Sequence, residues 1–143
     1  MKFFENLSER EKEMLLKFPA YISLLAANND KLDETEKKAA IKFTHIKTFT
    51  CDPLLSEFYK SAEKVFENNI EQLDQDLPKE HDKREAAIKK ELLKLEKIVS
   101  KLGKKYTIIM HHSMKSFKDH VSKAHNNVLM DFIFPIPIPG LSE

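Results

Sequence analysis

The sequence predicts an all-α protein: a single-domain bundle of about five helices, followed by an extended proline-rich C-terminal tail. Two observations lead to this prediction. Apolar residues recur at spacings of three and four over most of the chain, which is the period of a helix with one buried face. Helix-capping residues stand before these segments, and the two glycines, Gly103 and Gly140, lie outside them. We therefore expect a helical domain over residues 1–130 and an extended tail over residues 131–143.

The first helical segment begins at Ser8, where Glu11 completes a capping box. Pro19 interrupts this segment, so that either one helix kinks or a second helix begins there. The apolar stripe keeps its phase across the proline, which favours a kink or a tight break over a long loop. That stripe consists of Leu15, Phe18, Ile22 and Leu25.

The next two helices have clear start signals. Asp33 and Glu36 form a second capping box before a helix that runs to about Phe49. Asp52-Pro53 combines an N-cap acceptor with a proline at the first helical position. The expected inward residues are Ala39, Phe43 and Ile46 in the earlier helix, and Leu55, Phe58, Ala62, Val65 or Phe66, Ile70 and Leu73 in the later one, which ends near Pro78.

The last two helices follow Pro78 and Gly103. Gly103 lies just past the end of the fourth helix, where a left-handed residue is expected. The fifth helix is expected from about Lys105 to Met130, because a lone strand in its β-prone opening would have no partner. The inward residues are Ile88, Leu92, Leu95, Val99 and Leu102 in the fourth helix, and Met110, Phe117, Val121, Ala124 and Val128 in the fifth.

Charged stripes on the third and fourth helices predict how these two helices pack. A short turn at Pro78 would make them antiparallel neighbours, so that the acidic stripe of one faces the basic stripe of the other. The acidic residues are Glu63, Glu67, Glu71 and Asp74, and the basic ones are Lys90, Lys94, Lys97 and Lys101.

Composition excludes several classes of protein. Neither glycine lies in a nucleotide-binding loop, a nucleophile elbow or an EF-hand loop. The single cysteine, Cys51, excludes an internal disulfide framework and a cysteine-based zinc site. No apolar run approaches the ~18 residues of a transmembrane helix, and we expect a cytoplasmic protein. Basic residues are balanced locally by acidic ones, so nucleic-acid binding is not expected.

Four histidines fall close together in the fifth helix: His111, His112, His120 and His125. None has a metal-ligating residue three or four positions away, so no metal site forms on that helix alone. An interhelical site that joins His112 or His120 to carboxylates would make the protein a metalloenzyme. His81 and Glu85 do have helical i, i+4 spacing, but they supply only two ligands.

The turn before the second capping box is acidic. Asp30, Asp33 and Glu36 could supply oxygen ligands to a divalent cation, although capping accounts for Asp33 and Glu36 as well. The surrounding stretch, residues 24–41, resembles the signature of the tellurite-resistance TerB-like helical family: an apolar helix ending in Ala26-Ala27, an Asp-Gly-like turn, and a glutamate-rich start to the next helix. Asn29 and Asp30 stand where that family has Asp-Gly. The resemblance implies a helical domain, a possible cation site and a role in stress response or complex assembly.

The tail is too apolar for an ordinary solvated segment, and its prolines favour extended backbone. We expect it either to dock on a protein partner or a second copy of the chain, or to pack across its own bundle. Its candidate contact residues are Phe132, Phe134, Ile136, Ile138 and Leu141. Because no catalytic constellation is present, the sequence favours a non-enzymatic binding or adaptor protein. A cation-binding module that uses the turn Asp30–Glu36 is the alternative, and a metalloenzyme is a further one.

Overall fold

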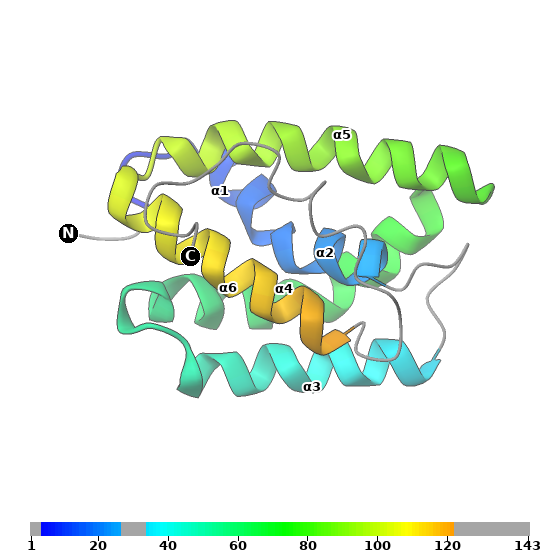
Figure 1. Cartoon of the computed structure of the whole chain (residues 1–143), viewed down its shortest axis with the longest axis horizontal. Helices are drawn as coiled ribbons and strands as arrows, with labels where there is room; N and C mark the ends of the chain where they lie inside the picture. Colours follow the sequence, from blue (N-terminus) through cyan, green and yellow to red (C-terminus); the bar gives the residue numbers. More distant parts are fainter. Residues whose placement is uncertain (1–3, 27–33, 122–143) are drawn as a thin grey trace.

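Six α-helices and one short 3-10 helix form the part of the chain that the computed structural model describes, residues 4–26 and 34–121 (Figure 1). No strand occurs among these residues, so the predicted all-α fold is confirmed. The elements are α1 (Glu9–Leu16), α2 (Phe18–Ala26), α3 (Glu34–Thr50), η1 (Pro53–Leu55), α4 (Ser56–Asp76), α5 (His81–Ser100) and α6 (Lys104–Val121).

The predicted break near Pro19 is a tight joint between two helices. Ser8 caps α1 by accepting a hydrogen bond from the Glu11 backbone, and the Glu11 side chain accepts one from Ser8 in return. Lys17 is the only residue between α1 and α2, which places Pro19 in the first turn of α2. Proline is tolerated there because the first-turn N–H groups have no partner within the helix.

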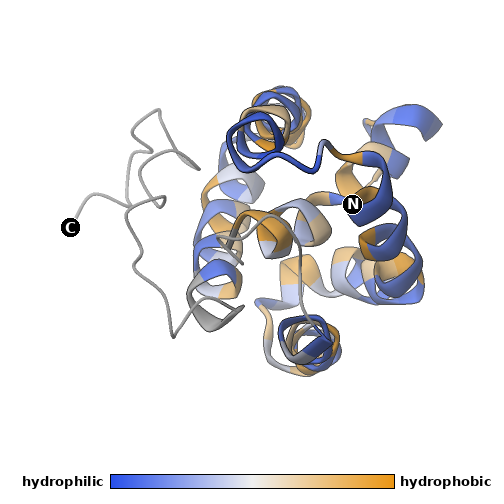
Figure 2. Cartoon of the chain, turned by 90° about the vertical axis from the view of Figure 1, so that its right-hand side faces the viewer, coloured by the Kyte–Doolittle hydropathy of each residue, from blue (hydrophilic) through white to orange (hydrophobic). Residues whose placement is uncertain are grey.

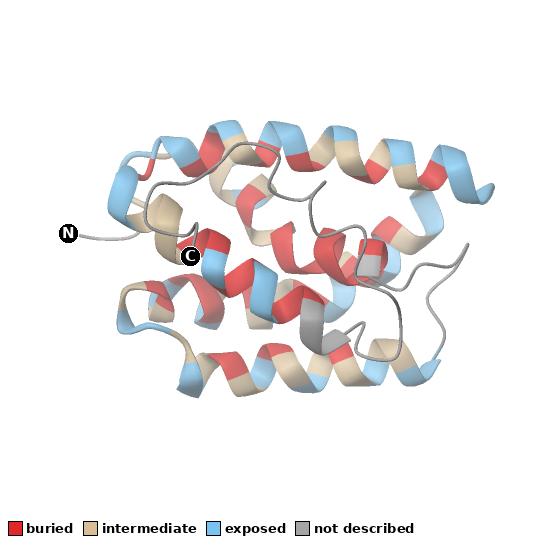
Figure 3. Ribbon diagram, viewed as in Figure 1, coloured by how far each residue is buried: buried red, intermediate tan, exposed pale blue. Residues whose placement is uncertain are grey.

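Helix α2 is the centre of the bundle. It contacts α4, α5 and α6, and every residue from Phe18 to Leu25 is buried (Figure 3). Viewed along the bundle, the apolar sides of the surrounding helices turn toward the interior (Figure 2). A helix that is apolar on all sides is stable only when other helices surround it. The sequence prediction of a single inward stripe therefore underestimated how much of α2 is buried.

The predicted inward faces are confirmed for α4 and α5 but shifted for α3. All five apolar positions predicted for the helix after Pro78 are buried, including Leu102 just past the end of α5. The positions predicted for the preceding helix are buried too, and of the alternatives Val65 and Phe66 it is Phe66 that is buried. In α3 the predicted residues Ala39, Phe43 and Ile46 are only half-buried. The residues that this helix buries fully are Ala40, Thr44 and Lys47.

The predicted pairing of acidic and basic stripes between α4 and α5 is wrong. Helix α2 packs against both, and among the described residues no ion pair joins the two stripes. Asp74 does pair with α5, but with Arg84, which is not part of the basic stripe. On α4, Glu63 pairs with His45 and Glu71 with Lys37, both on α3. Lys94 of α5 pairs with Glu91 of its own helix, and Lys101, just past the end of α5, pairs with Glu11 of α1.

Two turns hold the ends of α5. At its start, the buried Arg84 forms an ion pair with Asp74 and also donates to the carbonyl oxygens of Asp74 and Pro78, each at 3.3 Å. Past its end, Gly103 has a φ of +99°, the left-handed conformation that the sequence predicts.

No helix of the described residues is long and apolar enough to cross a membrane. The tail, residues 131–143, and the predicted end of the fifth helix beyond Val121 lie outside the described residues.

Candidate functional site

The structure separates the predicted site residues. Asp30 and Asp33 of the acidic turn lie outside the described residues, and Glu36 lies in the first turn of α3. The candidate contact residues of the tail also lie outside: Phe132, Phe134, Ile136, Ile138 and Leu141. Both the cation site in the acidic turn and the docking role of the tail therefore stay predictions.

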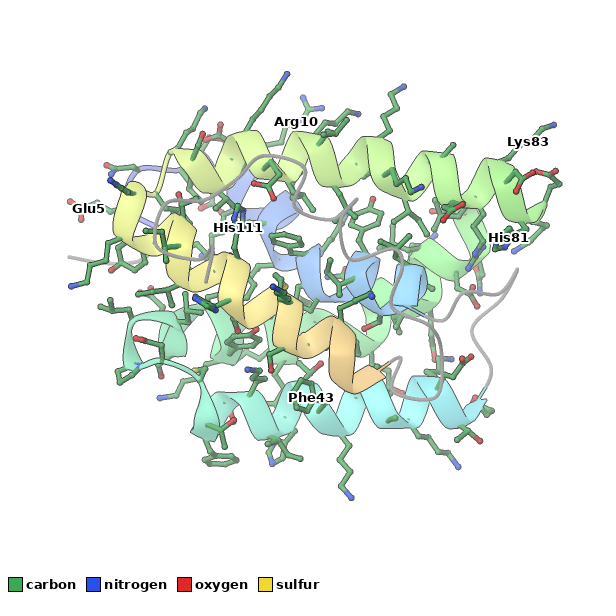
Figure 4. The ribbon with its side chains drawn as sticks, viewed as in Figure 1. Glu5, Arg10, Phe43, His81, Lys83 and His111 are labelled. Atoms are coloured by element: carbon green, nitrogen blue, oxygen red, sulfur yellow. The ribbon has the colours of Figure 1, made fainter. Side chains whose placement is uncertain are left out.

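The two adjacent histidines of α6 point in different directions. His111 is buried, and its Nε2 lies 2.6 Å from Oε1 of Glu96 on α5 (Figure 4). His112 is exposed. His120 belongs to α6, but its side chain is not among those described, and His125 lies outside the described residues. Within residues 4–26 and 34–121, His112 belongs to no group of three potential metal ligands.

One group of potential metal ligands does occur at the start of α5. His81, Asp82 and Glu85 offer ligand atoms that lie within 4.8 Å of one another (Figure 4 labels His81). The i, i+4 spacing of His81 and Glu85 in the sequence indicated two of these three residues. Glu85 also lies 3.5 Å from the ammonium of Lys89, which competes for the carboxylate. The group is at the surface, where clustered acidic side chains commonly bind no ion.

A cleft between α3, η1 and α6 combines more functional groups than these predicted sites. Its volume is about 280 Å³. The end of α3 and the turn after it form one wall, and one face of α6 forms the other. The lining residues are Lys47, Thr50, Cys51, Asp52, Leu55, Ile109, His112, Ser113 and Ser116.

Lys47 is the most unusual of these residues, because it is only 9% exposed. Its Nζ lies 5.5 Å from the centre of the Phe43 ring and 6.0 Å from that of Tyr59. No carboxylate of the described residues forms an ion pair with it. Burial lowers the pKa of Lys47 below its ordinary value, and the nearby Cys51 opposes this shift. Two aromatic rings lie near the ammonium, and they compensate only part of the cost of burying a lysine without an acidic partner.

The lysine reaches this position because of the helical spacing in α3. Lys47 follows Ala40 and Thr44 at intervals of four and three, so the three residues share the buried face of the helix. Phe43, which Figure 4 labels, lies on the adjacent side. Its ring contacts that of Phe117 on α6, with centroids 5.1 Å apart. Lys47 therefore lines the cleft from the buried side of α3, with its Nζ near the rings of Phe43 and Tyr59.

The other polar groups of the cleft are partly engaged. Ser113 is buried, and its hydroxyl lies 2.5 Å from the phenol oxygen of Tyr59. Thr50 donates to the Ile46 carbonyl, and Asp52 accepts the backbone N–H of Leu54 at 2.9 Å, which caps η1. His112 and Ser116 are exposed at the cleft.

Cys51 is half-buried beside Lys47 and is a free thiol. Burial raises its pKa, and Lys47 acts in the opposite direction but does not reverse the shift. A thiol with a raised pKa is a poor nucleophile at neutral pH. The adjacent His112 and Ser113 do not form a catalytic pair, since Ser113 turns inward to Tyr59 while His112 is exposed.

Comparisons of the chain with protein-family models, with curated proteins and with solved structures found no match. The resemblance of residues 24–41 to the TerB-like family therefore stays a prediction from the sequence.

Proposed function

We propose that this chain is a non-enzymatic helical binding protein that holds a small anion, a carboxylate or a phosphate group, in the cleft between α3 and α6. One observation carries the proposal. Lys47 is buried, lines a cleft of about 280 Å³ and has no acidic partner among residues 4–26 and 34–121.

The free energy of a buried charge supports an anionic ligand. Removing an ammonium from water costs several kcal/mol unless a partner compensates, and a cation–π contact returns only about 0.5–2 kcal/mol. Both ring contacts of Lys47 are near the outer limit of that interaction, at 5.5 and 6.0 Å. An anion that enters the cleft would supply the missing charge. It would also meet donors at the exposed side chains of His112 and Ser116.

The size and charge of the cleft limit the ligand. Typical small-molecule sites measure about 300–1,000 Å³, so a cleft of about 280 Å³ suits a small ligand rather than a nucleotide. Asp52 is the one carboxylate in the lining, and its interaction with the Leu54 N–H already compensates part of its charge. A ligand with a single anionic group and few other atoms fits these limits best.

Titration of the full chain with sodium phosphate, and separately with sodium acetate, tests the proposal. Amide chemical shifts are followed by two-dimensional NMR, with the ionic strength held constant by sodium chloride. Lys47→Met removes the ammonium but keeps an unbranched apolar side chain. Lys42→Met is the matched control, because Lys42 is exposed on the same helix. Circular dichroism checks that both variants keep their helix content.

We expect saturable shifts at Cys51, His112, Ser113 and Ser116 in the wild type and in Lys42→Met, and none in Lys47→Met. A single charged contact in a small site corresponds to a dissociation constant of about 1–10 mM. The proposal fails if neither anion produces saturable shifts at these residues. It also fails if the folded Lys47→Met variant shows the same shifts as the wild type.

A further inference from the structure

Lys47 differs from the other lysines of the described residues in its surroundings. Lysines such as Lys37 and Lys101 pair with glutamates at the surface. Lys118 is buried as Lys47 is, but it does not line the cleft. Lys47 alone combines burial, two aromatic neighbours and a position in the lining of the described cleft. This combination places a largely buried lysine beside a cleft.

We propose that Lys47 is also a nucleophile, whose Nζ forms an imine with a small aldehyde or ketone that enters this cleft. The inference rests on the proposed function in one respect, that the cleft admits a small molecule. It adds the chemical class of a second ligand, a carbonyl compound, and a covalent mode of binding. The bond is reversible, since water hydrolyses the imine back to the amine and the carbonyl compound.

The reaction balances without an oxidant or a further reactant. The lone pair of the neutral amine attacks the carbonyl carbon, and a C–N bond forms while the carbonyl π electrons move to oxygen. That oxygen takes up a proton, and the nitrogen loses one, which gives a carbinolamine. The hydroxyl group then leaves as water, with one more proton gained at oxygen and one lost at nitrogen, and the C=N bond forms. Solvent at the open side of the cleft exchanges these protons.

Three features of the site favour this chemistry. No carboxylate of the described residues holds Lys47 in its charged form. Burial lowers its pKa, so its neutral fraction at a given pH exceeds that of an exposed lysine. Burial raises the pKa of the neighbouring Cys51 thiol, which weakens the competing addition of a thiolate to the same carbonyl group.

Reductive labelling of the full chain tests the inference. The protein is treated briefly with propionaldehyde and sodium cyanoborohydride at about pH 7.5, and peptide mass mapping gives the extent of alkylation at each lysine. Lys42 is the matched reference, because it is exposed on the same helix. The α-amino group reacts readily at this pH and shows that the reagents are active. Labelling in 6 M urea shows the reactivity of each lysine once the burial is lost.

We expect Lys47 to be labelled at least about threefold faster than Lys42 in the folded chain, because its neutral fraction is larger. The preference should disappear in urea, and Lys118 should stay unlabelled in the folded chain. Equal or slower labelling of Lys47 in the folded chain would overturn the inference. A preference for Lys47 that persists in urea would overturn it too, since the fold would then not be its cause.

Sodium phosphate separates this inference from the proposed function. A phosphate ion beside Lys47 would hold the amine in its charged form, so phosphate should slow labelling at Lys47 and leave Lys42 unchanged. Selective labelling that phosphate does not slow would support the imine and count against anion binding. Saturable phosphate shifts in NMR without selective labelling would support anion binding and overturn the imine.

Discussion

Tyr21 should make the protein less stable at alkaline pH. Its side chain lies on α2 and is only 8% exposed. Burial, together with the negative charge of Glu91, raises the pKa of its phenol from 10.0 to about 12. The pKa in the folded state is therefore higher than in the unfolded state. Below about pH 10 both states keep the proton, and Tyr21 contributes no pH dependence.

Above about pH 10 the unfolded chain loses the phenol proton while the folded chain keeps it. The unfolded state then binds fewer protons, so the free energy of unfolding falls as the pH rises. With pKa values of 10.0 and about 12, the loss at pH 11 amounts to about 1–2 kcal/mol, since each pKa unit corresponds to about 1.4 kcal/mol. Tyr21→Phe removes this contribution and keeps the ring in place.

Urea unfolding of the wild type and of Tyr21→Phe, followed by circular dichroism at about pH 9 and about pH 11, measures the effect. Burial also raises the pKa of Tyr59 and lowers that of Lys47. These two shifts contribute equally to the pH dependence of the wild type and of the variant. The difference between the two proteins therefore isolates Tyr21. We expect the wild type to lose about 1–2 kcal/mol more than the variant between the two pH values. Equal losses would refute the assignment of a raised pKa to Tyr21.

Three further substitutions test the core, an exposed ring and a turn. Phe117→Ala should lower the free energy of unfolding by about 3–5 kcal/mol, because Phe117 is fully buried and its ring contacts Phe43 and Phe66. Phe49→Ala should change it by less than about 0.5 kcal/mol, because Phe49 is 77% exposed; urea unfolding compares the two. Gly103→Ala should cost about 1–2 kcal/mol through its φ of +99° alone, since nothing lies within 4 Å of an added Cβ, and thermal unfolding measures this loss.

Helical periodicity and capping residues were enough to predict most of the fold. They located the break before Pro19, the inward faces of α4 and α5 and the turn at Gly103, because each depends on residues close together in the sequence. They did not show which helix lies at the centre. The central position requires a helix that is apolar on all sides. The nearly continuous apolar run from Phe18 to Leu25 is the sequence feature that indicates such a helix.

The candidate site was not predicted, because its central residue, Lys47, is buried, whereas a sequence pattern assigns charged residues of a helix to the solvent-facing side. Lysine on a helix is normally solvated, so the periodic pattern placed the inward face of α3 on Ala39, Phe43 and Ile46. The spacing of Lys47 from Ala40 and Thr44 could have indicated that it is buried. These three residues lie on one side of α3 and form a second, less apolar face. The partners that complete the site come from α4 and α6, and no local pattern connects residues so far apart.

The position of Lys47 in the bundle explains how the fold can accommodate a buried charge. The centre of the core is α2, whose apolar residues contact α4, α5 and α6, and the large buried rings of Phe18, Phe58 and Phe66 lie within the same core. Helix α3 packs on the outside, against α4 and α6. Lys47 on this outer helix lines the cleft, which leaves room for a ligand to compensate its charge. An apolar residue at this position would remove the cost of burying the ammonium, but it would also remove the cation on which the proposed anion site depends.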